Sequence, residues 1–248
     1  MSDLNASPAW LERPLGELVL ERSGAAAVFE RFGLDYCCRG HQTLAEAARE
    51  RGVPAADVLA ALASEGPPDP SVTTEAWPSA DLDRLTRHIV DQHHRYLRET
   101  TPVIAAWLEK LLARHGTRHP ELVEIHATFQ GLAHELLTHI AKEENILFPF
   151  IDAMAVAQRE GGRLPKGPFG TVNNPVRVME QDHQRAGAMM ETLRTLTAGF
   201  TPPPDACTTF TLCYGELAQY AADLHRHIHL ENHVLFPGAL DLERALVS

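Results

Sequence analysis

The sequence predicts an all-α protein, with a small helical N-terminal domain followed by a four-helix bundle that contains an internal twofold repeat. Three observations support this prediction. Apolar residues favour helices along most of the chain, and no long stretch alternates with a period of two. A Pro-rich segment separates short helical patterns from long ones. The long patterns fall into two halves that share sequence, which is typical of a bundle made of two similar helix pairs.

The predicted N-terminal domain comprises residues 1–66 and contains three short helices. The first, AAAVFERF, should end at Gly33, because glycine readily takes the left-handed conformation that ends a helix. Thr43 and Glu46 fit a capping box that opens the second helix, and ADVLAALASEG forms the third. The Pro-rich stretch that follows predicts a linker over residues 67–79.

The predicted bundle comprises residues 80–248. Pro102 is expected to kink its first helix, because proline removes a backbone donor and clashes with the preceding turn. Asn174 is expected to cap the third helix, with Pro175 in its first turn. The four long helices are expected over about 81–114, 120–150, 174–198 and 205–236.

One helical segment of the bundle is present twice. HIAKEENILFP at 139–149 and HIHLENHVLFP at 227–237 are identical at six of eleven positions. A second repeated pair, IVDQHHR and VMEQDHQ, aligns His94 with His183 at nearly the same offset. The bundle therefore consists of two copies of a helix pair, each with a His on one helix and a His and a Glu on the next.

Each copy places a His and a Glu four residues apart, where the two side chains share one helix face. One such spacing is expected by chance, but His139–Glu143 and His227–Glu231 both lie in apolar stripes that a bundle buries. Glu144 should be turned away from this face. Burying two carboxylates costs several kcal/mol per ion without a partner, and neither stripe contains a Lys or Arg. A pair of metal ions would supply the missing positive charge.

We therefore predict a centre in which each of two cations binds two His and both Glu bridge them. Iron, manganese and zinc suit these donors, and bridging carboxylates favour iron. The alternative is a plain bundle with ordinary core histidines. His93 is as well placed as His94, but the repeat aligns it with Asp182, which, like Asp91 and Glu180, is a candidate to orient a ligand. The predicted ligands are His94, His139, Glu143, His183, His227 and Glu231.

Cys37 and Cys38 are adjacent in the segment LDYCCRG. Neighbouring Cα atoms are about 3.8 Å apart, so a disulfide between them would be strained. The following helix N-terminus and Arg39 favour lowered thiol pKa values, which would suit a redox, nucleophilic or metal-binding role. The alternative is that one or both are small buried residues. Cys207 and Cys213, on the fourth long helix, are interpreted as packing residues.

The composition excludes several classes of function. The chain has 22 Lys and Arg against 33 Asp and Glu, which argues against nucleic-acid or anionic-membrane partners. No apolar run approaches the length of a membrane span, and the N-terminus lacks the pattern of a secretory signal. Four cysteines in 248 residues do not indicate a disulfide scaffold. A cytoplasmic location is the expectation.

These motifs together resemble the iron–sulfur cluster repair di-iron proteins, whose C-terminal half is hemerythrin-like. The resemblance rests on DYCC, on the QTL helix start and on two H-x-x-x-E-x-x-[IV]-L-F-P segments, and it covers nearly the whole chain. It implies a bacterial cytoplasmic protein with two non-haem iron ions in an oxo-bridged centre. The family's ligand pattern corresponds to the six residues given above, and its paired cysteines correspond to Cys37 and Cys38.

The resemblance also implies a function. Such proteins restore iron–sulfur clusters damaged by nitrosative or oxidative stress by supplying iron, so damaged iron–sulfur proteins are the expected partners and a homodimer is expected. Oxygen-carrying hemerythrins typically use five histidines, and the four counted here argue against simple oxygen transport. Three alternatives stay open: a protein that binds or reduces nitric oxide, a sensor of oxygen or nitric oxide, and a structural bundle loaded with zinc.

Overall fold

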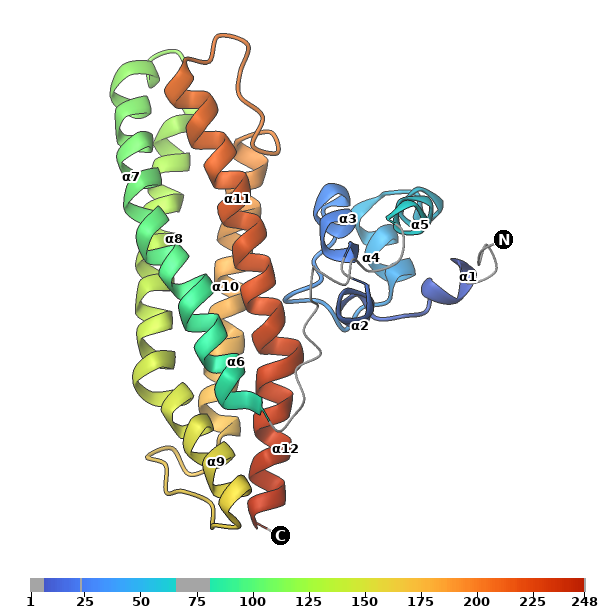
Figure 1. Cartoon of the computed structure of the whole chain (residues 1–248). Coiled ribbons are helices and arrows are strands. Elements are labelled where there is room, and N and C mark those ends of the chain that lie inside the picture. The colour runs from blue at the N-terminus through green and yellow to red at the C-terminus, as the bar shows by residue number, and fades with distance from the viewer. Residues whose placement is uncertain (1–6, 23, 66–80, 248) are drawn as a thin grey trace. The chain divides into compact units, whose positions relative to one another are not determined.

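Every regular element of the described residues is a helix, so the all-α prediction is confirmed (Figure 1). No strand occurs among the described residues; the nearest feature is an isolated antiparallel bridge between Pro14 and Thr43. The linker predicted at 67–79 lies outside the described residues. The chain divides into two compact units, which are described separately. The computed structural model describes residues 7–22, 24–65 and 81–247.

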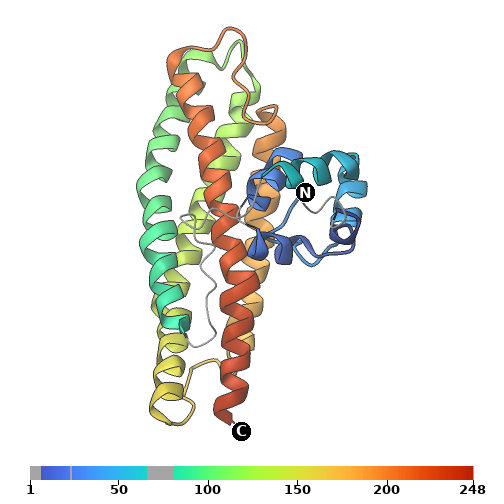
Figure 2. The same ribbon diagram turned by 45° about the vertical axis from the view of Figure 1, so that its right-hand side comes forward.

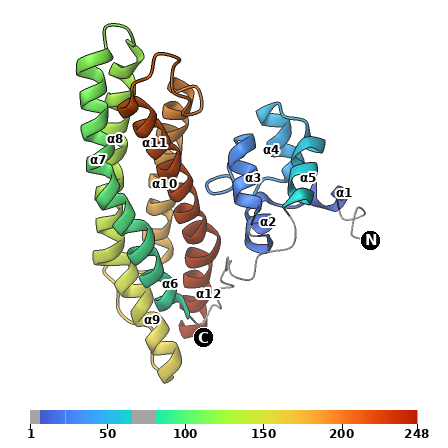
Figure 3. The same cartoon turned by 45° about the horizontal axis from the view of Figure 1, so that its top comes forward.

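The first unit is built mainly from five short helices, which Figure 3 displays together. Helix α5 packs against α3 and α4, and α2 packs against α3. Leu15, Phe29, Leu44 and Leu62 are among its fully buried side chains. The five helices are α1 (Ser7–Trp10), α2 (Leu15–Glu21), α3 (Ala25–Phe32), α4 (Leu44–Arg51) and α5 (Ala55–Ser64).

Two predicted signals at the ends of these helices, Gly33 and the capping box at Thr43, are confirmed. Gly33 ends α3 with a φ of 67°, a left-handed conformation that costs glycine little. Thr43 caps α4: its side chain accepts a hydrogen bond from the backbone N–H of Glu46, and the Glu46 side chain accepts one from the N–H of Thr43. The chain between these two signals is therefore held at both ends.

The second unit is a bundle of four long helical rods that run side by side in Figures 1 and 2. Helix α8 packs against both α7 and α10, and α9 packs against α6 and α12. A short π-helical turn, labelled η, interrupts three of the rods. The rods are α6 (Leu82–Ile89), η2 (Val90–His94) and α7 (Arg95–His115); α8 (Glu121–Lys142), η3 (Glu143–Leu147) and α9 (Phe148–Glu160); α10 (Asn173–Leu196); and α11 (Thr208–Leu230), η4 (Glu231–Leu235) and α12 (Phe236–Val247).

One predicted detail of the rods is wrong and another stays a prediction. Helix α7 includes Pro102, where a kink is expected, and the π-helical turn η2 precedes α7 in the same rod. The predicted cap at Asn174 is wrong, because α10 begins one residue earlier and the Asn174 side-chain amide donates to the carbonyl of Phe169. The carboxylate of Glu243 instead accepts the backbone N–H of Val172 at 2.8 Å. This cap comes from the end of the fourth rod, which a local sequence pattern does not reveal.

Among the described residues, no helix combines the length and the apolar character needed to cross a bilayer. The long helices instead bury one apolar face each. Leu85, Leu108, Phe129 and Leu217, which come from three rods, are all at most 1% exposed. This core surrounds the polar residues described next.

Candidate metal centre

All six predicted ligand residues come together inside the bundle. Each of the four rods contributes at least one of them, and the two rods that carry the His–Glu spacing contribute two each. Their exposed fractions are at most 3%. The buried set is His94, His139, Glu143, His183, His227 and Glu231.

The imidazoles form two pairs, and Glu143 lies between them. The Nε2 atoms of His94 and His227 are 3.1 Å apart, and those of His139 and His183 are also 3.1 Å apart. Oε2 of Glu143 lies 3.4 Å from Nε2 of His94, whereas its Oε1 lies 3.3 Å from Nε2 of His139. The two oxygens of one carboxylate thus face different imidazole pairs, as a bridging ligand would.

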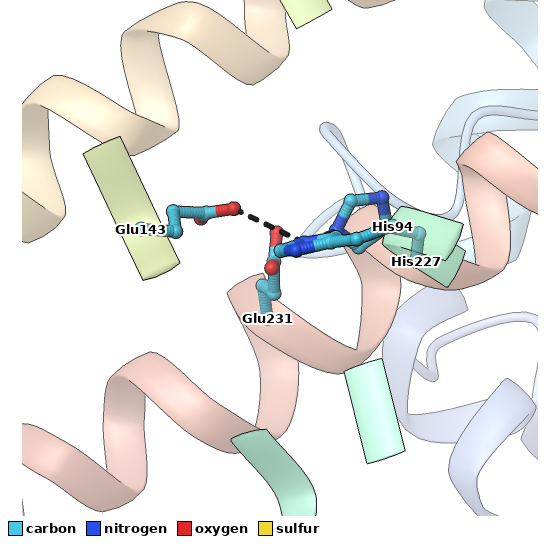
Figure 4. Close-up of side chains that lie close together, drawn as sticks. All are labelled: His94, Glu143, His227 and Glu231. Carbon is cyan, nitrogen blue, oxygen red and sulfur yellow. Dashed lines mark hydrogen bonds and ion pairs between the residues drawn. The ribbon is translucent and has the colours of Figure 1, made fainter. Parts of the chain in front are cut away.

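Figure 4 shows the half of this centre that includes His94 and His227. The side chains of Glu143 and Glu231 point toward the imidazoles from two different rods. Both carboxylates are 0% exposed. Two carboxylates in such a place repel one another, and the cost of burying their charge is several kcal/mol per ion unless positive charge lies nearby.

The geometry fits two metal ions. The ligand atoms fall into two groups of four, each within 4.8 Å, and Glu143 and Glu231 belong to both groups. At a metal–nitrogen distance of about 2.1 Å, two imidazoles bound at a right angle would place their nitrogens about 3 Å apart, close to the 3.1 Å found here. The groups are His94, Glu143, His227 and Glu231, and His139, Glu143, His183 and Glu231.

The π-helical turns lie at three of the predicted ligands. Turn η2 ends at His94, η3 begins at Glu143 and η4 begins at Glu231. A π-helical turn holds one residue more than an α-helical turn and is frequent at functional sites. The pairs His139–Glu143 and His227–Glu231 precede the extra residue, so their α-helical spacing is intact. This is why the sequence pattern predicted the correct face.

The phenylalanine of each repeated LFP segment stacks on a ligand imidazole. Phe148 stacks on His94 with ring centroids 5.6 Å apart, and Phe236 stacks on His183 at 5.8 Å with rings only 5° from parallel. Within each repeat, the second helix therefore supports the histidine of the first. The sequence interpretation did not assign this role to the two phenylalanines, although their identity in both copies was a signal.

Glu144 contacts the centre, contrary to expectation. Its Oε1 lies 2.7 Å from Nδ1 of His94 and 2.8 Å from a guanidinium nitrogen of Arg98. We expected Glu144 to turn away, but the ring of His94 extends from the neighbouring rod and meets it beside η3. A proton on Nδ1 of His94, donated to this carboxylate, leaves Nε2 for a cation.

Asp182 lies where an orienting carboxylate was expected. Its Oδ2 is 3.4 Å from Nδ1 of His139 and 2.8 Å from Nζ of Lys142, and its other oxygen accepts from Arg185. The hydrogen bond with His139, followed by that from Lys142, holds the pKa of Asp182 well below its ordinary value. Asp182 is therefore an anion whose charge is shared among three partners.

The choice between His93 and His94 is clear in the geometry. Nε2 of His94 faces the centre, whereas Nδ1 of His93 lies 3.0 Å from Oδ1 of Asp223. The ring of His93 stacks on His227 with an interplanar angle of 2°. His93 thus supports a ligand histidine and belongs to neither group of ligand atoms.

Cys37 and Cys38 lie in the chain between α3 and α4, and neither is part of a disulfide. The expected lowering of the thiol pKa is wrong for Cys37, because its contact with the Cys38 thiol, together with burial, raises its pKa well above the ordinary value. Arg39, which was expected to lower it, lies 2.7 Å from Glu50 instead. Cys213 is buried, as expected of a packing residue, and burial raises its pKa to about 12.

Two family models match the chain. Residues 85–239 match the Hemerythrin HHE cation binding domain, and residues 11–65 match a domain of unknown function, DUF542. The first match covers the bundle with its ligand residues, and it implies that the cation is non-haem iron. The expectation of a hemerythrin-like bundle is therefore confirmed.

Curated relatives match over nearly their whole length. The iron–sulfur cluster repair protein YtfE of Musicola paradisiaca is 37% identical over 229 residues, which cover 92% of this chain and 96% of that protein. The proteins of that name from Escherichia coli and Escherichia fergusonii are 36% identical over 235 residues, covering 94% of this chain and 98% of theirs. With both family models and these relatives in agreement, the chain belongs to the iron–sulfur cluster repair protein family, and its bundle is a hemerythrin domain.

Proposed function

We propose that the chain is a di-iron protein that repairs damaged iron–sulfur clusters by donating iron. The observation that carries the proposal is the pair of buried carboxylates, Glu143 and Glu231, each of which belongs to two groups of ligand atoms. The repair role is also the one named for the relatives that match the full length of the chain. The proposed iron ligands are His94, His139, Glu143, His183, His227 and Glu231.

The ligand set favours the release of one iron ion more readily than the second. Bound iron supplies a cation that neutralises the carboxylates and that can leave as the ferrous ion, which binds more weakly than most later divalent metals. Glu143 and Glu231 serve both positions, so after one position empties they still hold the other cation. Emptying the second position would remove the last cation from beside both buried carboxylates, which is more costly.

The ligand assignment is tested by replacing the shared carboxylates. Glu143→Ala and Glu231→Ala should each reduce the iron content from two ions per chain to one or fewer, because every position uses both residues. Glu124→Ala, an exposed substitution on the same rod as Glu143, serves as the matched control and should keep two ions. Elemental analysis of protein purified without added metal gives the count. Two ions per chain in both glutamate variants would refute the ligand set.

The repair role is tested separately by transfer. The reduced, iron-loaded protein should rebuild the cluster of an apo iron–sulfur protein under anaerobic conditions, with iron lost from the donor appearing in the acceptor. The Glu143→Ala variant should support little reconstitution under the same conditions. If the loaded protein keeps its iron while the acceptor stays empty, the donor role is wrong even if the ligand set is correct.

A second function is favoured by the small number of ligands. Each group offers two imidazoles and two shared carboxylates, which leaves room at each iron for a small ligand. Binding or reduction of nitric oxide is therefore the alternative function. Anaerobic exposure of the protein to nitric oxide in the presence of excess reductant separates the two: repeated production of nitrous oxide indicates an enzyme, whereas stoichiometric binding without product does not.

A further inference from the structure

The chain between α3 and α4 brings three side chains with metal-binding atoms together, well apart in sequence from the bundle ligands. Sγ of Cys37 lies 3.3 Å from Oδ1 of Asp35 and 3.7 Å from Sγ of Cys38. One ligand atom from each of the three residues lies within 4.8 Å of the others. Two thiols and a carboxylate at these distances are a donor set and not merely a pair of neighbouring cysteines.

The distance between the two sulfurs matches a chelate. A disulfide would require about 2.05 Å, so the 3.7 Å separation is clearly non-bonded. Two thiolates that bind one tetrahedral cation at about 2.3 Å would lie about 3.8 Å apart, and a thiolate and a carboxylate oxygen at about 2.1 Å would lie about 3.6 Å apart. The observed Sγ–Sγ distance of 3.7 Å and the Sγ–Oδ1 distance of 3.3 Å are both close to these ligand–ligand distances.

Backbone hydrogen bonds hold this arrangement in place. Oδ1 of Asp35 accepts the backbone N–H of Cys37 at 3.2 Å and that of Cys38 at 2.9 Å, which fixes the carboxylate beside both thiols. The preceding helix ends at Gly33, and the following one begins at the capping box of Thr43, so both ends of the segment are anchored. Because the ligand atoms are held in position before binding, little ordering entropy is lost when a cation binds.

We propose that Asp35, Cys37 and Cys38 form a second metal site, which binds one divalent cation such as zinc or ferrous iron and leaves its fourth position open. The cation would replace the proton of each thiol, and two protons would pass to solvent. The resulting set of two thiolates, one carboxylate and one divalent cation carries a net charge of −1. Thiolates select zinc and iron over magnesium or calcium. Cys38 is only partly buried, which gives an incoming cation or thiolate access.

The proposal that this cluster binds a divalent cation stands on its geometry alone. The proposal that the cation is iron on its way to an acceptor protein rests on the iron-donor function proposed above. A site with three ligands and an open position can pass a cation to an acceptor thiolate by ligand exchange, with no change in oxidation state. The bundle centre, which lacks sulfur ligands, would hold the stored iron, and the thiolate site would handle one ion at a time.

Cobalt(II) tests the site in the full-length chain. Thiolate ligation produces intense near-ultraviolet charge-transfer absorption, which the His and Glu ligands of the bundle do not give. Anaerobic titration of the reduced, metal-free protein should develop this band until one cobalt per chain is bound by thiolates, in addition to the cobalt that the His and Glu ligands of the bundle take up. The Cys38→Ser variant should lose it, and Asp35→Asn should weaken binding by about tenfold because a neutral amide is a poorer ligand.

Cys207→Ser is the matched control, since Cys207 is also partly exposed but lies on the bundle; this variant should keep the full band. Far-ultraviolet circular dichroism confirms that each variant is folded. Absence of the band in the wild-type protein would overturn the proposal, as would its persistence in a Cys37→Ser/Cys38→Ser double variant.

Transfer kinetics separate this proposal from the donor function. With the bundle loaded with iron and reduced, Cys38→Ser should retain its iron yet donate it to an apo acceptor about tenfold more slowly. Donation at the wild-type rate would refute transit through the thiolate site while leaving the donor function standing. A cobalt band without any iron donation by the wild-type protein would leave the site standing and refute the donor function.

Discussion

The carboxylate of Glu144 lies one residue after a proposed bridging ligand and 2.7 Å from Nδ1 of His94. It is held in turn by Arg98, whose guanidinium lies 2.8 Å away. A histidine that donates its Nδ1 proton to a carboxylate presents Nε2 in a fixed direction and becomes a stronger donor to a metal. Glu144 is therefore a positioning residue for His94, and Asp182 occupies the corresponding place beside His139.

The first prediction concerns this contact. Glu144→Gln keeps the size of the side chain but replaces the anion with a neutral amide, so His94 should hold its cation less strongly. We expect iron affinity to fall by about tenfold, in the range found for such outer partners of metal ligands. Competition against a ferrous chelator under anaerobic conditions measures the change, and Glu124→Gln on the surface of the same rod is the control. An iron affinity equal to that of the wild type would show that Glu144 does not position His94 for metal binding.

The six proposed ligands could be predicted from the sequence, whereas Glu144 and the two stacking phenylalanines could not. His139 and Glu143 lie on one α-helical face within apolar positions, and the internal repeat selected His94 over His93. The contact of Glu144 depends on how η3 sets it against a neighbouring rod. An isolated pattern with a period of 3.6 residues carries no information on such a turn.

At the level of elements, Asp83 joins the two helices α6 and α9 that meet at one end of the bundle. Its oxygens accept two hydrogen bonds from the guanidinium of Arg159, at 3.0 and 3.2 Å, and a third from Arg87. Arg159 is the main reason that the pKa of Asp83 lies below its ordinary value. Since the pKa is lowered in the folded state, Asp83 stabilises the fold at pH values above its unfolded pKa, and this contribution is lost as the pH falls through the folded one.

The second prediction follows from the lowered pKa of Asp83. Asp83→Asn should lower the free energy of unfolding by about 1 kcal/mol at neutral pH, the upper range for exposed ion pairs. The difference from wild type should shrink as the pH falls below about 4, where the carboxylate becomes protonated. Denaturant unfolding at neutral and acid pH measures both values.

Asp241→Asn is the control for this experiment. Asp241 also pairs with an arginine, Arg244, at 3.0 Å, but both side chains are more than 65% exposed and belong to one helix. Its effect should stay within about 0.5 kcal/mol at either pH. A pH-independent loss in Asp83→Asn would indicate a packing defect in place of a lost ion pair.

Helix boundaries were predictable where the signal is local and not where it is distant. Gly33 and the pair Thr43–Glu46 act within one turn, and both predictions are confirmed. The start of α10 depends on Glu243, about 70 residues further along the chain, which accepts the backbone N–H of Val172. Asn174 fitted the local pattern of a cap, but the tertiary partner determined where the helix begins.

At the level of the whole molecule, the buried carboxylates make the stability of the fold depend on its cations. Glu143 and Glu231 are fully buried, and burying their negative charges is costly unless positive charge lies nearby. Metal that binds only the folded chain adds about 2.7 kcal/mol when its concentration is a hundredfold above its dissociation constant. The loaded protein should therefore unfold at a clearly higher temperature than the chelated one.

The third prediction reverses this effect by substitution. The double variant Glu143→Gln/Glu231→Gln removes the buried charge, so its metal-free form should be more stable than the metal-free wild type by at least about 1 kcal/mol. Its stability should respond much less to added ferrous iron than that of the wild type. Thermal unfolding with and without iron compares the two. If the metal-free wild type proves more stable than the metal-free double variant, the two buried carboxylates do not destabilise the fold.

The π-helical turns have a consequence for how the chain tolerates changes in length. Deleting one residue inside η3, such as Asn145, would let the turn close into an ordinary α-helical one, and the rod beyond it would keep nearly its present direction. Phe148 would then stay close to the ring of His94, on which it now stacks, whereas a deletion within the regular part of α9 would rotate everything beyond it by about 100°. The π-helical turns are therefore the points at which these rods can lose one residue with the least disturbance to the proposed ligands on either side.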